Sequence, residues 1–197
     1  MENQIKRTAL NCQEEYNPAY CFEDLFTETE TCPWEEGCAL EMPEEFAPSR
    51  GNVLDTISLS KEYKITFSLK ANSFPPQNIY HSVFAILTAS VGGESAVGLW
   101  IRGEQSTYVT FYNTAKPVSS DSNELPLITL GQWTNIEISS TLAEDGDINI
   151  FRVKINGQQV LETDNPDAMN YSKLRVWSGD SLNAPLNGVI KDFFVSA

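Results

Sequence analysis

The chain has 197 residues, with 13 Lys and Arg against 27 Asp and Glu and a formal charge of −14. This is the length of one ordinary domain with at most a short appendage. The apolar fraction of 41% and the aromatic fraction of 11% can fill a core, which excludes a wholly disordered chain. The charge argues against a nucleic-acid partner, because phosphate contacts depend on Lys and Arg. No apolar run approaches the ~20 residues of a membrane helix, so we expect no membrane insertion.

Residues 1–48 differ from the rest in acidity and in cysteine content. They hold 12 acidic residues against two basic ones, together with all the cysteines of the chain, Cys12, Cys21, Cys32 and Cys38. This predicts an acidic, loop-rich segment over 1–48 and a separate unit over 49–197. The segment has few large apolar residues, so we expect two disulfides to stabilise it, with the pairing left open. Disulfides imply a secreted, extracellular protein. A zinc site is the alternative, although no Cys-x-x-Cys pair is present.

Calcium and an N-glycan are two further candidates. Calcium prefers carboxylate and carbonyl oxygens, and the candidate ligands in the loops of the second unit are Asp145, Asp147 and Asp180. The alternative is that Asp and Asn occupy these loops for their turn geometry alone. The single sequon, Asn170-Tyr171-Ser172, makes Asn170 the candidate glycosylation site.

Alternation of apolar and polar residues with period two recurs over 49–197 and predicts an all-β fold. The predicted strands are 63–70, 82–89, 97–102, 107–112, 134–138, 151–155, 174–177 and 188–195. Turn signals such as Asn156-Gly157 separate them, and Asn-Gly favours a two-residue turn with positive φ. Residues 82–89 are apolar on both faces, as in a central strand. We therefore expect an antiparallel sandwich of two sheets.

Three segments carry a family resemblance: Leu130-Gly131-Gln132-Trp133, the hairpin Val153-Lys154-Ile155-Asn156-Gly157, and the terminal Gly188-Val189-Ile190-Lys191-Asp192-Phe193. They resemble the concanavalin A-like lectin/glucanase jelly roll in its laminin G-like, invertebrate extracellular form. These are framework motifs and span the second unit only, so the resemblance implies a jelly-roll fold and no particular activity. Trp133 is expected to be part of this framework.

Side-chain parity predicts an aromatic and basic surface that faces away from the core. If the apolar positions of three strands point inward, their neighbours point outward. The outward set is Trp100, Arg102, Tyr108, Tyr112, Arg175 and Trp177. Aromatic rings stack on sugars, arginine binds hydroxyls or anions, and both residue types are common in protein interfaces. The alternative is that they form cross-strand pairs that only stabilise the sheet.

Motifs for catalysis are missing from the sequence. No strand carries the paired carboxylates of a glycosidase, since Glu137 is alone on its strand. The single histidine, His81, has no Gly-x-Ser-x-Gly motif as a partner. We therefore expect a secreted, non-enzymatic recognition or adhesion module that binds a glycan or an extracellular protein. The alternatives are a structural matrix protein that assembles into homo-oligomers, with or without calcium, and a divergent glycoside hydrolase.

Overall fold

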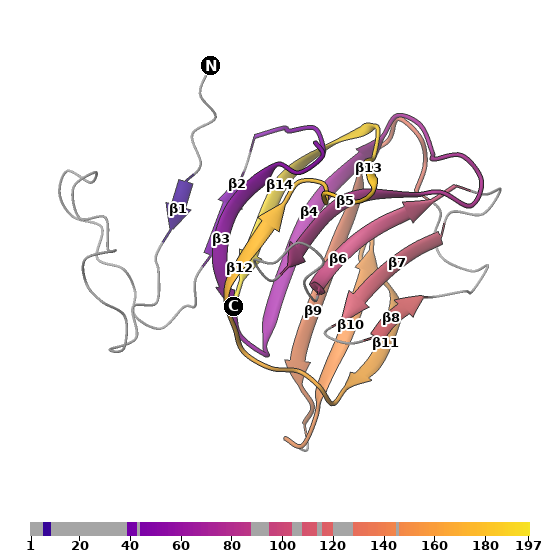
Figure 1. Cartoon of the computed structure of the whole chain (residues 1–197). Coiled ribbons are helices and arrows are strands. Elements are labelled where there is room, and N and C mark those ends of the chain that lie inside the picture. Colours follow the sequence, from indigo (N-terminus) through magenta and orange to yellow (C-terminus); the bar gives the residue numbers. More distant parts are fainter. Residues whose placement is uncertain are drawn as a thin grey trace, which may run out of the picture.

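The protein is a sandwich of two β-sheets (Figure 1). The computed structural model describes residues 6–8, 39–42, 44–87, 95–103, 108–113, 116–119, 128–144 and 146–197. Every regular element in these ranges is a β-strand, which confirms the predicted all-β class. None of the described residues forms a helix with the length and apolarity to cross a membrane. The four cysteines lie outside these ranges, so the disulfides stay a prediction.

Sheet A has the strand order β1-β2-β14-β4-β9-β10-β11. Its strands are β1 (Lys6–Thr8), β2 (Ala39–Met42), β14 (Gly188–Ser196), β4 (Tyr63–Ala71), β9 (Thr134–Leu142), β10 (Asn149–Ile155) and β11 (Gln158–Asn165). Sheet B has the order β3-β12-β5-β6-β7-β8, and β13 pairs with β5. Its strands are β3 (Val53–Leu59), β12 (Tyr171–Trp177), β5 (Tyr80–Leu87), β6 (Ser95–Arg102), β7 (Tyr108–Asn113), β8 (Lys116–Ser119) and β13 (Ala184–Pro185). Only β13 pairs in parallel; the other pairings of described strands are antiparallel.

Aromatic rings from both sheets meet in the core. Phe84 of β5 contacts Phe67 of β4 and Phe193 of β14, with ring centroids 5.2 and 5.5 Å apart and interplanar angles of 76° and 71°. Such edge-to-face packing is the arrangement that the ring quadrupoles favour. Phe84 and Phe193 are fully buried. These contacts join sheet B to sheet A through the centre of the sandwich.

A β-bulge in β14 reconciles its sequence with the core. Strict alternation from buried Ile190 would place Asp192 inside and Phe193 outside. The register instead shifts between Lys191 and Phe194, and Asp192 adopts a φ of 52°. The bulge adds one residue to the strand, so Phe193 is buried and Asp192 is exposed. The bulge therefore keeps the carboxylate of Asp192 in solvent and out of the core.

The sandwich extends further toward the N-terminus than the composition indicated. Strand β2 pairs with β14, and Phe46 forms a bridge with Ile190. Leu40 and Met42 of β2 belong to the buried core. Residues 39–42 are thus part of sheet A, because the side chains of Leu40 and Met42 alternate onto its inner face. The local acidity of 1–48 concealed this short strand.

The predicted Asn-Gly hairpin is confirmed. Asn156 and Gly157 have φ values of 50° and 80°, and they join β10 to β11 in antiparallel register. Positive φ at both central positions defines the turn whose twist matches that of the flanking strands. All eight predicted strands are present, and β5 begins earlier than predicted, at Tyr80.

We expect Tyr63→Phe to stabilise the protein. Tyr63 is 8% exposed, and its hydroxyl has no hydrogen-bond partner within the described structure. Burial, with a smaller contribution from nearby Tyr171, raises the pKa of the hydroxyl well above its usual value. An unsatisfied buried polar group costs ~1–3 kcal/mol. The Phe variant should therefore gain about 1 kcal/mol in the free energy of unfolding, measured by urea denaturation. A loss of stability would mean that the hydroxyl makes a favourable contact.

Candidate functional site

Sheet B brings the predicted binding residues onto neighbouring strands. The order β12-β5-β6-β7 places the strands of all six residues within one sheet. The side chains that parity assigned to the interior of β6 and β12 lie in the core: Val97, Leu99, Ile101, Leu174 and Val176. The intervening residues Trp100, Arg102 and Arg175 point away from it. We refer to this surface as the outer face of sheet B.

One row of residues crosses the outer face from β12 to β7. Trp177 pairs with Ala85, Ala85 with Gly98, and Gly98 with Tyr112. Tyr108 pairs with Arg102 in the next strand. The side chains of both tyrosines lie outside the described structure, so their part in the face stays a prediction. The backbone register nevertheless places Tyr112 in the same row as Trp177, and Tyr108 opposite Arg102.

Trp100 is covered and does not offer a free stacking surface. It is 6% exposed, and a Cβ atom on Gly98 would lie 2.3 Å from its Cη2 atom. Only glycine therefore lets the indole lie against the strand at this point. The indole Nε1 donates to Oδ2 of Asp180 at 2.5 Å. Trp100 thus supports the outer face of sheet B from below. Its burial argues against the predicted role as a ligand contact.

Asp180 is a buried carboxylate that holds the loop after β12. Its Oδ1 accepts hydrogen bonds from the backbone N–H groups of Leu182 and Asn183, at 2.8 and 2.6 Å. Its Oδ2 accepts from the Asn183 amide at 2.9 Å as well as from Trp100. Burial raises the pKa of Asp180, but the hydrogen bonds from Asn183, Trp100 and Leu182 outweigh it and hold that pKa below its usual value. Asp180 is therefore a charged structural group.

The same loop is attached to the sandwich at further points. The backbone N–H of Asp180 donates to Ser82 Oγ of β5 at 3.0 Å. Arg50 Nε donates to the Ser181 carbonyl at 3.0 Å. Leu182 is 69% exposed on this loop. The loop over residues 178–183 thus forms a fixed border beside β5.

Arginine and aromatic side chains remain accessible around this border. Arg175 is exposed and Trp177 is half-buried, with an indole N–H that is buried and has no acceptor in the described structure. Arg102 donates to Asn78 Oδ1, and its guanidinium lies 5.6 Å from the centroid of Tyr80. Tyr80 is 39% exposed. A ligand could reach these four side chains.

Sequence reasoning missed Tyr80. The register of β5 shifts between Ser82 and Phe84, so Val83 is an additional residue in this strand. The shift places Ser82 opposite Trp100 and Tyr80 opposite Arg102. Strict alternation counted back from Ala85 gives the opposite parity. The pairing of an exposed Tyr with an Arg is visible only once the bulge is known.

Of the predicted calcium ligands, Asp180 is engaged in protein hydrogen bonds, and a site at Asp145 and Asp147 stays a prediction. No three His, Cys, Asp or Glu side chains in these ranges are grouped closely enough to hold a metal ion. Asp145 lies outside the described residues. Asp180 uses both carboxylate oxygens in protein hydrogen bonds, which explains why an Asp at this loop position need not bind metal.

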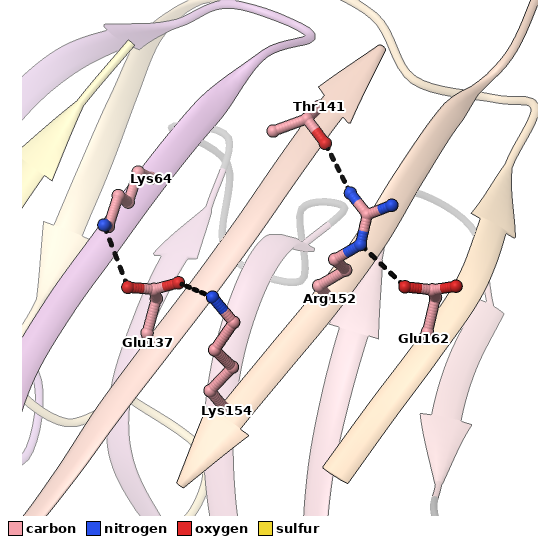
Figure 2. A network of polar contacts seen from close by, with 6 residues as sticks. All are labelled: Lys64, Glu137, Thr141, Arg152, Lys154 and Glu162. Atoms are coloured by element: carbon pink, nitrogen blue, oxygen red, sulfur yellow. Dashed lines mark hydrogen bonds and ion pairs between the residues drawn. The ribbon is translucent and has the colours of Figure 1, made fainter. Parts of the chain in front are cut away.

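Glu137 lies between two lysines on the outer face of sheet A (Figure 2). Its Oε2 is 2.9 Å from Lys64 Nζ, and its Oε1 is 2.9 Å from Lys154 Nζ. Hydrogen bonds from Lys64 and Lys154 lower the pKa of Glu137. A glycosidase general acid needs a raised pKa, so Glu137 is suited to an ionic cross-strand contact instead.

Trp133 lies on the surface of the sheet. The sequence motif predicted a framework role for it, but its side chain is not part of the core. It is half-buried on the outer face of sheet A, where the Nζ atoms of Lys70 and Lys191 each lie 4.6 Å from its ring centroid. Because it immediately precedes β9, its side chain follows the outward row of that strand. Its framework role is thus limited to the surface of the sheet.

His81 and Asn170 occupy ordinary structural positions. His81 lies within β5, paired with Ile101 and Ala184, and burial lowers its pKa. Asn170 is exposed, and its Oδ1 accepts a hydrogen bond from the Lys61 backbone N–H at 2.9 Å. An N-glycan at Asn170 stays a prediction.

Comparison with known proteins supports the fold. No protein-family model matches the chain, and no curated protein sequence matches it. Among solved structures, a heptameric SAP-like pentraxin from Limulus polyphemus matches 77% of this chain and 74% of its own, with a TM-score of 0.53 and 14% identity. This similarity covers most of both chains.

Two further matches involve parts of larger proteins. The extracellular region of zebrafish Gpr126/Adgrg6 matches 79% of this chain and 21% of its own, with a TM-score of 0.51 and 14% identity. Trypanosoma rangeli sialidase matches 80% of this chain and 25% of its own, with a TM-score of 0.50 and 8% identity. At these identities the similarity shows the fold alone: a two-sheet jelly-roll sandwich, as the sequence motifs implied.

Proposed function

We propose that this protein is a secreted, non-catalytic recognition module that binds a glycan on the outer face of sheet B. The observation that carries the proposal is the set of accessible Arg and aromatic side chains around a rigid border. Trp177 offers part of an aromatic ring for stacking on a sugar, and Arg175 beside it offers hydrogen-bond donors. Arg102 is already oriented by Asn78 and Tyr80.

Preorganisation supports a binding role for this surface. The loop over 178–183 is fixed by Asp180, Ser82 and Arg50. Side chains that are ordered before binding lose less conformational entropy in the complex. The similar structures, a pentraxin, the extracellular region of Gpr126/Adgrg6 and a sialidase, come from different kinds of protein. They therefore support the fold of the module, and its ligand is identified by experiment.

A glycan array followed by titration of each retained glycan tests this proposal. Trp177→Ala should weaken binding about fivefold, because stacking of one ring contributes on the order of 1 kcal/mol. Arg175→Ala should weaken it by a smaller factor. Arg152→Ala, on the outer face of sheet A, is the matched control and should bind as the wild type does. Melting temperatures of the variants separate loss of binding from loss of fold.

Two results would contradict the proposal. One is the absence of any retained glycan; the other is unchanged affinity in the Trp177 variant. If an extracellular protein binds in place of a glycan, the exposed apolar residues beside the face provide the contact. These are Ile79 at 47%, Tyr80 at 39% and Leu182 at 69% exposure. Substituting Leu182 with Asp would then weaken binding while leaving the glycan array blank.

A further inference from the structure

The outer face of sheet A carries two pairs of lysines, and a carboxylate bridges only one of these pairs in the described structure. In the first pair, the carboxylate of Glu137 bridges Lys64 and Lys154, with both Nζ–O distances at 2.9 Å (Figure 2). In the second pair, Lys70 and Lys191 gather around the ring of Trp133 instead. No carboxylate bridges this second pair within the described structure.

Three segments of sheet A bring the second pair together. Lys70 lies on β4 and Lys191 on the adjacent β14, where Val189 pairs with Lys70 and Lys191 with Ser68. Trp133 directly precedes Thr134, the residue of β9 that pairs with Leu69. The three side chains therefore converge through strand register, with the bulge at Asp192 next to them.

The charge at this point is unusual for the chain. Each ammonium lies 4.6 Å from the same ring centroid, so two positive charges gather at one aromatic ring. The ring attracts each of them but carries no net negative charge. Among the described residues, Asp192 is paired with this site: its Oδ2 is 3.8 Å from Lys191 Nζ, and its side chain is 60% exposed. Two gathered cations thus form a local positive site in a protein with a net charge of −14.

Uncharged donors lie beside the lysines. Ser68 and Asn135 occupy the same row as Lys191. The Ser68 hydroxyl donates to Asn135 Oδ1 at 2.9 Å, which leaves the Asn135 amide N–H groups without an acceptor in the described residues. Asn135 is exposed. A ligand with an anionic group and neighbouring hydroxyls could contact both the lysines and this amide.

We propose that Lys70, Lys191 and Trp133 form a second binding site, which takes the carboxylate or sulfate group of an acidic oligosaccharide. The anionic group pairs with the ammonium groups gathered at the ring, a contact of the kind that Glu137 makes with Lys64 and Lys154. Trp133 holds the two long side chains near the position that they need, which lowers the entropy lost on binding. The site is on the opposite sheet from the proposed glycan-binding face and does not depend on it.

Calorimetric titration of the full chain at low salt tests the site. The probes are a sulfated hexasaccharide, a carboxylated hexasaccharide, an uncharged hexasaccharide and inorganic sulfate. We expect at least one of the two acidic oligosaccharides to bind and the uncharged one to show no binding; the two acidic probes show which anion is preferred. Binding of inorganic sulfate alone, or equal binding of the uncharged probe by the Trp177→Ala variant, in which the face on sheet B is impaired, would overturn the proposal.

Matched charge variants locate the binding. Lys70→Gln and Lys191→Gln should each weaken the binding of the acidic oligosaccharide about tenfold, because each substitution removes one charge-assisted contact. Lys61→Gln, an exposed lysine of the β3–β4 turn, makes the same change in net charge and should bind as the wild type does. Equal losses of affinity in all three variants, or no loss of affinity in Lys70→Gln and Lys191→Gln, would contradict the proposed site. Trp177→Ala should leave this affinity unchanged, which separates it from the face on sheet B.

Discussion

Replacing Phe84 with alanine is expected to lower the free energy of unfolding by about 3–5 kcal/mol. The side chain is fully buried, and its ring contacts Phe67 and Phe193 of the opposite sheet. Its removal would leave a cavity at the point where the two layers meet, and the surrounding strands cannot close it without breaking their register. Chemical denaturation monitored by circular dichroism measures the loss.

A matched control separates core packing from the general effect of removing a phenylalanine. Phe194 lies next to Phe193 on β14 but is only half-buried. Phe194→Ala should therefore lower the free energy of unfolding clearly less than Phe84→Ala does. A double-mutant cycle should also show coupling between Phe84 and Phe193, since their rings are in contact. Equal losses for Phe84 and Phe194, with no coupling across the sheets, would contradict the sandwich.

Replacing Asp180 with alanine is expected to lower the free energy of unfolding by about 3 kcal/mol. The residue is 3% exposed, and its carboxylate accepts hydrogen bonds from Trp100, Leu182 and Asn183. Alanine would leave these donors unsatisfied beneath the loop. Asp192→Asn, at a side chain that is 60% exposed, is the control and should change stability by less than about 0.5 kcal/mol. Comparable effects of the two substitutions would show that the Asp180 network contributes little.

Asp180 also predicts a pH dependence. Its pKa is lower in the folded protein than its usual value, because the hydrogen bonds outweigh the effect of burial. The stabilisation by the charged form is therefore complete above the unfolded pKa, about 3.9, and is lost as the pH falls through the lower folded value. The wild type should lose more stability than Asp180→Asn between about pH 4 and pH 2. Parallel pH profiles would contradict this assignment.

Much of the fold could be predicted because it depends on period-two burial. The alternation in β4, β6, β9, β10 and β12 identified the inner face of each strand, and Asn156-Gly157 identified a hairpin. The positions that escaped prediction lie at bulges and on short or polar strands. Strand β2 is hidden in an acidic segment, and the bulges at Val83 and Asp192 reverse the parity that alternation implies.

The candidate sites were less predictable, for a related reason. Parity gives the side of the sheet but not what lies above it. Trp100 points outward as expected, yet it is buried and donates a hydrogen bond to Asp180 of the neighbouring loop. Lys70, Lys191 and Trp133 are distant in sequence, and only the pairing of β14, β4 and β9 brings them together. Such clusters depend on strand order, which the local pattern does not contain.

The central claim is that the two outer faces of the sandwich bind different ligands. Hydrogen exchange measured by mass spectrometry, with an uncharged glycan retained on the array and then with an acidic oligosaccharide, tests it most directly. The uncharged ligand should slow exchange in β12 and the loop over 178–183, and the acidic one in β4, β14 and the start of β9. Protection of the same strands by both ligands would contradict the claim.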